Sequence, residues 1–450
     1  MKSTMNIVRA GCPSLTLLAL GILFGHHGSA IAQDRAELDA LKQQLEEQRN
    51  NSRRLEDRIN KLSENQSERI KDPSPVSSSN AGYDGGFYIK DVTGNNSLYV
   101  NGIVLPRFNR FETNGTDRYG GIDSTSNNFD VFLGRLYFSG NVSDPSIKYW
   151  FTLQGTTTGN GSDLTLLDAK VSKDFNPYLT VEAGKYWSAY TYEYYVDIGK
   201  YLIPDLSAAE WAFSLGRQIG TRVSGKSGRL GYSFSVSNSI SGSDVGSNQN
   251  THEKLAAILN VNYDVLEPYG YQETDPGTMW VNKPQLSIWA SAMYNPVEYT
   301  SVFQNDLKGD KTHGATASVN YRYGHFSTQV SGYYKKNEGR DGNSSFESHG
   351  WQEQAGYYLV PGKLELAQRI DQVRWGRGQI AESGGKANQW YAGPANFSFN
   401  RLTEYTAGLN YYFVGHKAKT QLAYSYLDGK GFDGGDFDAK RLLLQAQVAF

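Results

Sequence analysis

The chain has 450 residues and a formal net charge of −2, which is enough length for one or two ordinary domains or for one large barrel. A charge so near zero excludes binding of nucleic acid through a basic surface. Mean hydropathy is −0.54, and past the first thirty residues no apolar run reaches the roughly 18 residues of a membrane helix. Aromatic residues make up 13% of the chain and Gly occurs 48 times, a composition that favours strands joined by tight turns.

The N-terminus has the three parts of a secretory signal peptide. Lys2 and Arg9 precede the apolar run "LTLLALGILF", and an A-x-A cleavage site ends at Ala32. We therefore expect residues 1–32 to be removed, which leaves a formal charge of −4. The single Cys12 lies in this segment, so we expect a mature chain without disulfides and without a cysteine metal site. We also expect no cofactor.

Residues 33–72 predict a coiled coil. They are charged, free of Gly and Pro, and carry apolar residues at spacings of three and four, which are the core positions of a heptad repeat. These residues are Leu38, Leu41, Leu45, Leu55, Ile59 and Leu62, with polar Gln48 and Ser52 at the two remaining core positions. A single solvated amphipathic helix is the alternative, although so narrow a stripe would find no core of its own. Residues 73–97 contain a Pro/Ser linker and the entrance to the next domain.

From about Gly82 the hydrophobic period changes from 3.5 to 2 and stays there. Sixteen candidate strands begin near Leu98, Asn128, Pro145, Asp163, Pro177, Arg217, Arg229, Glu253, Lys283, Thr312, His325, Gly350, Gly362, Arg401, His416 and Asp438. Short turns alternate with long polar loops, except that "EPYGYQETDPGTMWVN" is a long connection on the short-turn side. This organisation predicts an all-β transmembrane barrel of about 16 antiparallel strands over residues 98–450.

A soluble β-sandwich or lectin also alternates. Here, however, the polar face stays rich in Ser, Thr, Asn, Gln, Lys and Arg through most strands, as the wall of a water-filled lumen requires. Sixteen strands also fall in the size range that leaves an aqueous channel open.

Several stretches resemble the phosphate-selective porin O and P family of trimeric outer-membrane channels. They are "GYDGGFYIKDVTGNNSLYVNGIVLPRF", "FLGRLYFSGNVSDPSIKYWFTLQG", "LGRQIGTRVSGKSG", "LELAQRID" and "TEYTAGLNYYF". The resemblance runs from about Gly82 to Phe450. It implies a sixteen-stranded homotrimer in the outer membrane of a Gram-negative-type cell, in contact with outer-membrane lipid, through which small hydrophilic solutes diffuse.

The candidate constriction is the connection after the fifth strand, residues 188–216, which is the longest and least polar loop on its side. It is too apolar to stand free in water, so we expect it to fold inward, although an aromatic belt at the lipid interface is the alternative. The residues expected at the constriction are Tyr190, Tyr192, Glu193, Tyr194, Tyr195, Asp197, Lys200, Asp205 and Glu210.

Strand parity predicts a predominantly basic lumen wall. The basic residues assigned to it are Arg107, Arg135, Lys148, Arg222, Arg322, Arg369 and Arg441, with Lys170, Lys335, Lys417 and Lys419 beside them. Parity also places four acids there, namely Asp168, Glu182, Glu365 and Asp371. An acidic loop opposite a basic wall would set a transverse field and favour small anions modestly, unless pairs such as Arg369 with Asp371 or Glu365 cancel it.

The loop departs from the family name in one respect, because residues 188–216 contain no Arg. Phosphate recognition favours converging guanidinium forks, so we expect a general or weakly anion-preferring porin. The aromatic run could as well offer apolar faces to sugar rings. A phosphate- or polyphosphate-selective channel remains the alternative.

An enzyme is not expected, because the five His residues of the mature chain stand in no recognisable arrangement with Ser or Asp. A structural role is the second alternative, in which the coiled coil lies in the periplasm and ties the barrel to the cell wall.

The last strand ends on Phe450. We expect this strand to pair with the first strand and so remove both sheet edges. Phe450 would then lie at the periplasmic interface, where it resembles the terminal aromatic signal recognised by the barrel-assembly machinery.

Overall fold

The computed structural model describes part of residues 42–54, and residues 80–117, 120–121, 123–157, 163–238, 254–278, 281–296, 299–300, 308–339, 345–376, 399–431 and 435–450. The chain divides into two compact units, Met1–Ser78 and Ser79–Phe450. In the first unit, the described residues between Lys42 and Arg54 are helical. The expected signal peptide and most of the expected coiled coil and linker lie outside the described residues. No helix in the described part of the chain is both long and apolar enough to cross a membrane.

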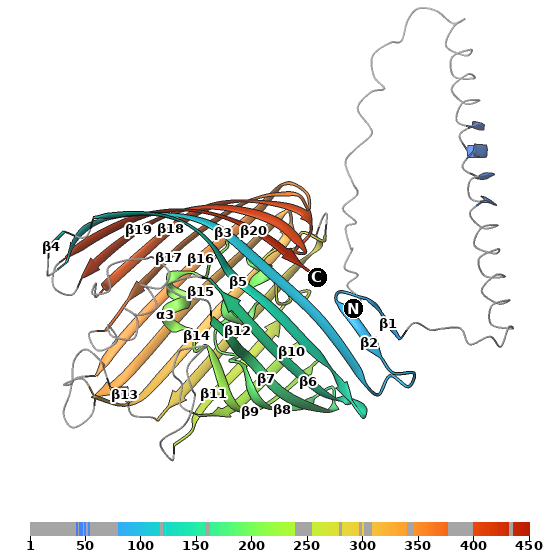
Figure 1. Cartoon of the computed structure of the whole chain (residues 1–450), viewed down its shortest axis with the longest axis horizontal. Helices are drawn as coiled ribbons and strands as arrows, with labels where there is room; N and C mark the ends of the chain where they lie inside the picture. The colour runs from blue at the N-terminus through green and yellow to red at the C-terminus, as the bar shows by residue number, and fades with distance from the viewer. Residues whose placement is uncertain are drawn as a thin grey trace, which may run out of the picture. The chain divides into compact units, whose positions relative to one another are not determined.

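The second unit contains a closed antiparallel barrel of sixteen strands (Figure 1). The strands are β3 (Ser97–Asp117), β5 (Ser124–Val142), β6 (Asp144–Thr156), β7 (Asp163–Asn176), β8 (Leu179–Trp187), β9 (Arg217–Ser227), β10 (Leu230–Ser237), β11 (Ala256–Asp264), β12 (Val281–Asn295), β14 (Lys308–Gly324), β15 (Phe326–Gly339), β16 (Phe346–Val360), β17 (Leu364–Arg374), β18 (Phe399–Val414), β19 (Ala418–Gly431) and β20 (Asp436–Ala449). Each strand pairs with the next, and β20 pairs with β3. Two short strands, β4 (Gly120–Gly121) and β13 (Tyr299–Thr300), pair with β3 and β14. The predicted barrel and its strand order are therefore confirmed.

Side chains alternate between the lumen and the outer surface because successive residues of a strand point to opposite faces. In β20, Arg441, Gln445 and Gln447 are buried in the lumen, whereas Leu444 and Val448 are 44% and 60% exposed on the outside. The same pattern places Val104, Phe151, Phe234, Leu259, Val319, Val330, Leu366, Leu409 and Leu422 outside. The barrel thus has an apolar outer face, as lipid requires, and a polar inner face.

Aromatic side chains gather on the outer face where the strands meet the short turns. Tyr323 pairs with Phe326 across one such turn, and Phe326 also pairs with Tyr357 of the next strand. Further exposed aromatics at this end are Tyr178, Tyr263, Tyr411 and Phe413. These positions are those of an interfacial aromatic girdle, so the lipid belt is separate from the tyrosines of residues 188–216.

The chain terminus completes the seam between β20 and β3. Phe450 and Gly102 exchange two backbone hydrogen bonds of 2.9 Å. The Phe450 ring lies over Gly102, where an added Cβ would collide with it. A hairpin of β1 (Ala81–Tyr83) and β2 (Phe87–Lys90) continues along the same edge of β3, and the Phe87 and Phe450 rings are 5.9 Å apart. The last residue of the chain is therefore held by the first strand of the barrel.

Two connections fold into the barrel. The first, residues 188–216, contains α2 (Tyr192–Tyr195), the 3₁₀ turn η1 (Ile198–Lys200) and α3 (Ala208–Phe213). In Figure 1, α3 is enclosed by the strands, and it packs against β15, β16, β17 and β18. The second, residues 265–280, joins β11 to β12 on the short-turn side, and its contacts are described below.

Candidate pore constriction

The connection 188–216 has a buried apolar side that packs against the lumen wall. Tyr192, Tyr194 and Tyr201 lie with Trp289 of β12 in one cluster, and the Phe213 ring stacks on Tyr333 of β15 at 5.4 Å. Such aromatic area is stable only when it is removed from water. The predicted inward fold is thus what the structure contains, and no part of this loop belongs to the lipid belt.

Local sequence fixes the last helix of the loop. Ser207 is the N-cap of α3, and its hydroxyl accepts a hydrogen bond from the Glu210 backbone N–H at 2.9 Å. This is the usual role of Ser before a first helical turn. The backbone N–H of Ala209 donates to Asp371 of β17 at 3.1 Å, so the start of α3 is tied directly to the wall.

Asp205 is the point at which the loop meets the basic wall. Its carboxylate forms ion pairs with Arg107 of β3, at 2.8 Å, and with Arg441 of β20. Arg369 of β17 donates to the Asp205 backbone carbonyl at 2.7 Å. Three wall arginines therefore converge on one loop residue, and Asp205 is itself only 5% exposed. The Arg convergence that residues 188–216 lack is supplied by the strands.

A second acidic group lies next to this point. Glu193 of α2 pairs with Arg369 at 3.5 Å and accepts a hydrogen bond from Gln352 at 2.8 Å. Glu210 of α3 accepts from the Tyr194 backbone N–H at 3.0 Å and from the Tyr333 hydroxyl at 2.7 Å. Burial raises the pKa of Glu193, and burial together with the neighbouring Glu193 carboxylate raises the pKa of Glu210 to about 8.

These contacts correct one expectation from the sequence. An acidic loop was expected to face a basic wall across open space and to set a transverse field. Instead, the Asp205 and Glu193 carboxylates touch the guanidinium groups of the wall. Wall pairing adds to this cancellation, because Arg369 also lies 3.5 Å from Asp371 and 3.6 Å from Glu404. The expected Arg369 pair with Asp371 is present, and Glu365 instead bonds Thr274, Asn410 and Tyr412.

The remaining predicted wall residues are placed as follows. Arg135 donates to Gln154 at 2.6 Å, and Arg222 pairs with Glu182 at 2.7 Å. Lys170 also reaches Glu182. Lys148 is half exposed and pairs with Asp174 at 2.6 Å. Lys417 was expected on the lumen face but is exposed in the turn before β19 and bonds Tyr83, because the strand that would set its parity begins only at Ala418.

The other predicted constriction residues lie along the loop. Tyr190 is buried, and its backbone carbonyl accepts hydrogen bonds from Trp289 and Thr316 at 3.0 and 2.8 Å. Asp197 accepts from the Gly199 N–H at 2.9 Å and so caps η1. Lys200 is exposed. Tyr195 is partly buried, with its ring 5.2 Å from that of Trp289.

The predicted wall left out several buried charged residues, among them Arg217 and Glu404. Arg217 opens β9 and would face lipid by parity, but it is 1% exposed and pairs with Asp168 at 3.0 Å. It turns inward because the loop ends immediately before it. Glu404 of β18 is buried beside Arg369. Its even number, shared with lumen-facing Thr406 and Asn410, was a sufficient signal.

The sequence also left the inward position of residues 265–278 unrecognised. Glu273 accepts from the Leu202 backbone N–H at 2.6 Å, and Arg322 of β14 donates to the Gln272 carbonyl at 2.9 Å. Thr274 reaches Glu365 of β17 at 2.5 Å. Burial, together with the nearby Glu193, raises the pKa of Glu273 to about 8. The unusual length of this short-side connection was the one available sign that it does more than turn the chain.

The groups that line the lumen are suited to passage and electrostatic selection. Within the described ranges, no group of three or more His, Cys, Asp and Glu side chains is arranged to hold a metal ion.

The model of the protein family described as phosphate-selective porin O and P matches residues 119–450 of this chain. Among solved structures, OmpT of Vibrio cholerae is 11% identical, with 82% of this chain and 99% of OmpT covered and a TM-score of 0.51. The outer membrane channel DcaP of Acinetobacter baumannii is 13% identical, with 80% and 99% covered and a TM-score of 0.51. OprB of Pseudomonas putida is 8% identical, with 78% and 94% covered and a TM-score of 0.50. The comparison with curated proteins finds no match. At these identities the solved structures bear on the fold alone.

Proposed function

The chain belongs to the phosphate-selective porin O and P family and is an outer-membrane porin for small solutes; from this premise we propose a weakly anion-preferring diffusion channel whose constriction is the connection 188–216. The observation that carries this proposal is the position of Asp205 between Arg107 and Arg441. The loop is held by the neighbouring strands β3 and β20 at Asp205 and by β12 and β14 at Tyr190. A loop held at separate parts of the wall narrows the path for solutes, and the groups at the narrowest part decide selectivity.

The anion preference is weak because most lumen charges are neutralised in pairs. The buried cations include Arg107, Arg135, Arg217, Arg222, Arg322, Arg369, Lys419 and Arg441. The buried acids include Asp168, Glu182, Glu193, Asp205, Glu210, Glu273, Glu365, Asp371 and Glu404. At neutral pH the raised pKa values of Glu210 and Glu273 keep these two groups largely protonated. When Asp264 is counted as well, the eight buried cations and the eight remaining buried acids balance. The modest anion preference that we propose therefore rests on the three arginines gathered around Asp205 and not on a net charge of the lumen.

The convergence of three arginines supports a second candidate, a phosphate-selective channel. A phosphate could occupy the same guanidinium forks, but it would first have to displace the Asp205 carboxylate from Arg107 and Arg441. General diffusion needs no such exchange, so we place it first.

Bilayer recordings of the reconstituted protein separate the two candidates. We expect a small reversal potential of anion-selective sign in a KCl gradient, with phosphate added to one side causing little block. A cation-selective sign would overturn the anion preference. Strong block by phosphate at low concentration would establish the phosphate-selective alternative instead.

For assembly, we propose a homotrimer with the coiled coil of residues 33–72 in the periplasm. Leu45, one of the expected core positions, is 53% exposed in the single chain, as an unpaired coiled-coil seam would be. Deletion of residues 34–72 should leave single-channel conductance unchanged and weaken the cell envelope if the coil ties the barrel to the cell wall. Loss of conductance with an intact envelope would contradict this role.

We also propose that Phe450 is read by the barrel-assembly machinery. Its ring is 37% exposed at the seam, so it is accessible as well as packed. Deletion of Phe450 should reduce the yield of heat-resistant barrel in the outer membrane while the barrels that form conduct normally. A Gly102→Ala variant, which disturbs the packing of the same ring but keeps the aromatic terminus, separates recognition from packing. Normal yield of the deletion variant would contradict the proposal.

A further inference from the structure

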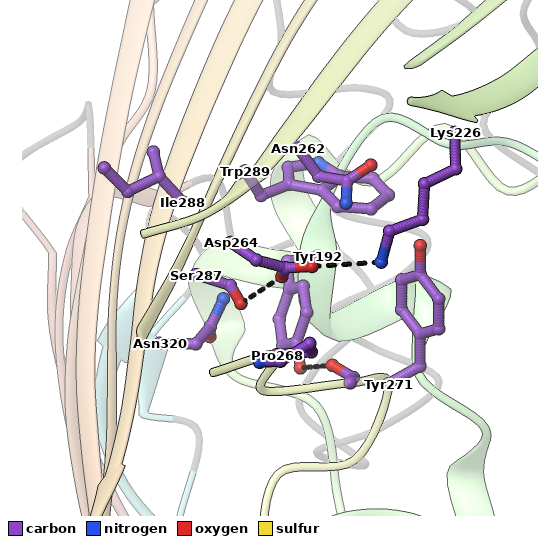
Figure 2. A pocket seen from close by; sticks show the side chains of 11 residues that line it. Tyr192, Lys226, Asn262, Asp264, Pro268, Tyr271, Ser287, Ile288, Trp289 and Asn320 are labelled. Atoms are coloured by element: carbon purple, nitrogen blue, oxygen red, sulfur yellow. Dashed lines mark hydrogen bonds and ion pairs between the residues drawn. The ribbon is translucent and has the colours of Figure 1, made fainter. Parts of the chain in front are cut away.

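A pocket lies between the two inward connections, on the wall formed by β11, β12 and β14 (Figure 2). About 390 Å³ of space not filled by protein atoms lies within it, a volume that includes open solvent. Tyr192 comes from the constriction loop, and Pro268 and Tyr271 come from residues 265–280. Tyr192 and Trp289 also take part in the constriction contacts described above, whereas Asp264 and Asn320 do not.

One side of the pocket is aromatic. The rings of Tyr271 and Trp289 are 6.3 Å apart and perpendicular, at 89°. The Tyr192 ring lies 5.9 Å from Trp289, and its hydroxyl donates to the Gly270 carbonyl at 2.8 Å. Trp289 itself donates to the Tyr190 carbonyl, so its indole is fixed in orientation. A fixed aromatic surface accepts the C–H face of a saturated ring without requiring charge.

The opposite side is polar but balanced in charge. Asp264 accepts from Lys226 at 3.0 Å and from the Ser287 hydroxyl at 2.7 Å. Figure 2 shows the Lys226 amine reaching toward Asp264, with Tyr271 beside it. One cation and one anion already paired offer little to a charged solute. A phosphate, in particular, would meet the Asp264 carboxylate.

Two amides complete the polar side. Asn262 lies opposite Gly231 in the sheet, where a Cβ would collide with the Asn262 amide. Asn320, the cross-strand partner of Ser287, is 0% exposed. Neither side-chain atom of Asn320 has a hydrogen-bond partner among the described residues. Leaving a buried amide unpaired costs free energy, so this group is ready to exchange hydrogen bonds with something inside the pocket.

We propose that this pocket binds a neutral, polyhydroxylated ring of about the size of one hexose. The ring would stack on Tyr271, which is 48% exposed and is held in place by the buried Trp289. The hydroxyl groups of the ligand would donate to Asp264, and the Asn320 amide would both donate and accept. Neutral pockets with one aromatic face and a few convergent polar groups favour such ligands. The inference rests on the proposed function as a channel and gives that channel a class of solute that dwells at its wall.

Direct binding is the test, with D-glucose as the probe and the full-length mature protein in detergent micelles. Isothermal titration should show millimolar binding of glucose, about tenfold weaker binding of sorbitol, which has hydroxyl groups but no ring, and no competition by inorganic phosphate. Asn320→Ala should weaken glucose binding about tenfold, the effect of roughly one hydrogen bond. Tyr271→Ala should weaken it by a similar factor.

Asn295→Ala is the matched control. Like Asn320, Asn295 of β12 is a buried lumen amide with an unpaired oxygen among the described residues, but it lies outside the pocket. It should change glucose affinity by less than about twofold. The proposal would be overturned if the wild type did not bind glucose, or if both pocket variants bound it with wild-type affinity. Binding of phosphate instead of glucose would also overturn it.

KCl conductance is measured on the same samples. Conductance without glucose binding would refute the pocket and leave the porin function intact. Glucose binding without conductance would refute the proposed channel and leave the pocket. Migration of the unheated variants as folded barrels on electrophoresis confirms that a loss of binding is not a loss of fold.

Discussion

The lumen wall holds the constriction loop differently on its two sides. On β3, β17 and β20, it uses buried guanidinium groups, and Arg107, Arg369 and Arg441 all reach Asp205. On β12 and β14 it uses neutral donors, with Trp289 and Thr316 both bonding the Tyr190 carbonyl. Ser233, Ser235 and Ser291 are small polar lumen residues on this side. Its buried cation, Arg322 of β14, bonds Gln272 of the second connection and not the constriction loop.

The charged and the neutral contacts have different effects on the position of the loop and on the electrostatic field that a solute meets. Buried charges are costly to desolvate and costly to separate once paired, so the basic side fixes the position of the loop and stores the charge that could attract anions. Neutral hydrogen bonds contribute about 1 kcal/mol each. The neutral side therefore orients the loop without adding to the field.

The largest effect should come from Asp205→Asn. The change removes the carboxylate shared by Arg107 and Arg441, and breaking a buried ion pair from one side costs roughly 3–5 kcal/mol. The loop should loosen on the basic side and two guanidinium groups should become available to anions. We expect larger conductance and a rise of about threefold in the chloride-to-potassium permeability ratio, since fixed charge sets the local ion concentration. Reversal potentials in a KCl gradient measure it.

Asp197→Asn is the control for this variant. It also removes one negative charge from the loop, but Asp197 caps Gly199 and is not paired with an arginine of the basic side in the described structure. A permeability ratio that rises equally in both variants would show that total loop charge matters and that the contrast between the two sides does not.

A change of pH should have a smaller effect on conductance, because it titrates the buried acids that lie close to the basic side. The pKa of Glu210 is raised from 4.5 to about 8 in the docked loop, chiefly by burial. The docked loop therefore binds more protons than a released loop. This contribution to docking is fully present below about pH 4.5 and is lost as the pH rises through about 8.

Conductance should accordingly increase between pH 6 and pH 9, by about twofold if loop release is partial. Deprotonated Glu210 and Glu273 would then join Glu193 as buried like charges. Glu210→Gln, which imitates the protonated group, should flatten the profile. An unchanged profile in this variant would exclude Glu210 as the titrating group.

The sequence alone predicted the regular strands better than the residues at their ends. Alternation predicted the strands and most wall residues because burial on one face forces period 2. It placed Arg107, Arg369 and Arg441 in the lumen, and the aromatic content of residues 188–216 predicted their inward fold. Parity failed where regular structure ends, as at Arg217 beside the loop and Lys417 in a turn.

Contacts between distant segments could not be read in this way. The meeting of Asp205 with Arg107 and Arg441 joins two strands and a loop that are far apart in sequence. Nothing local to Asp205 distinguishes it from Asp197. The pocket at Asn320 depends in the same way on residues 265–278 entering the lumen, for which the length of the connection between β11 and β12 was the only sign.

The smallest effect should come from the neutral side, with Thr316→Val. The substitution keeps the shape of the side chain and removes the hydroxyl that donates to Tyr190 at 2.8 Å. Trp289 still donates to the same carbonyl at 3.0 Å, so the acceptor keeps one partner and the loss should be about 1 kcal/mol or less. Conductance and reversal potential should stay within about 20% of wild type, since no charge changes. A shift in selectivity as large as that of Asp205→Asn would mean that the loop is positioned from the neutral side, because the charge of the lumen is identical in the variant and the wild type.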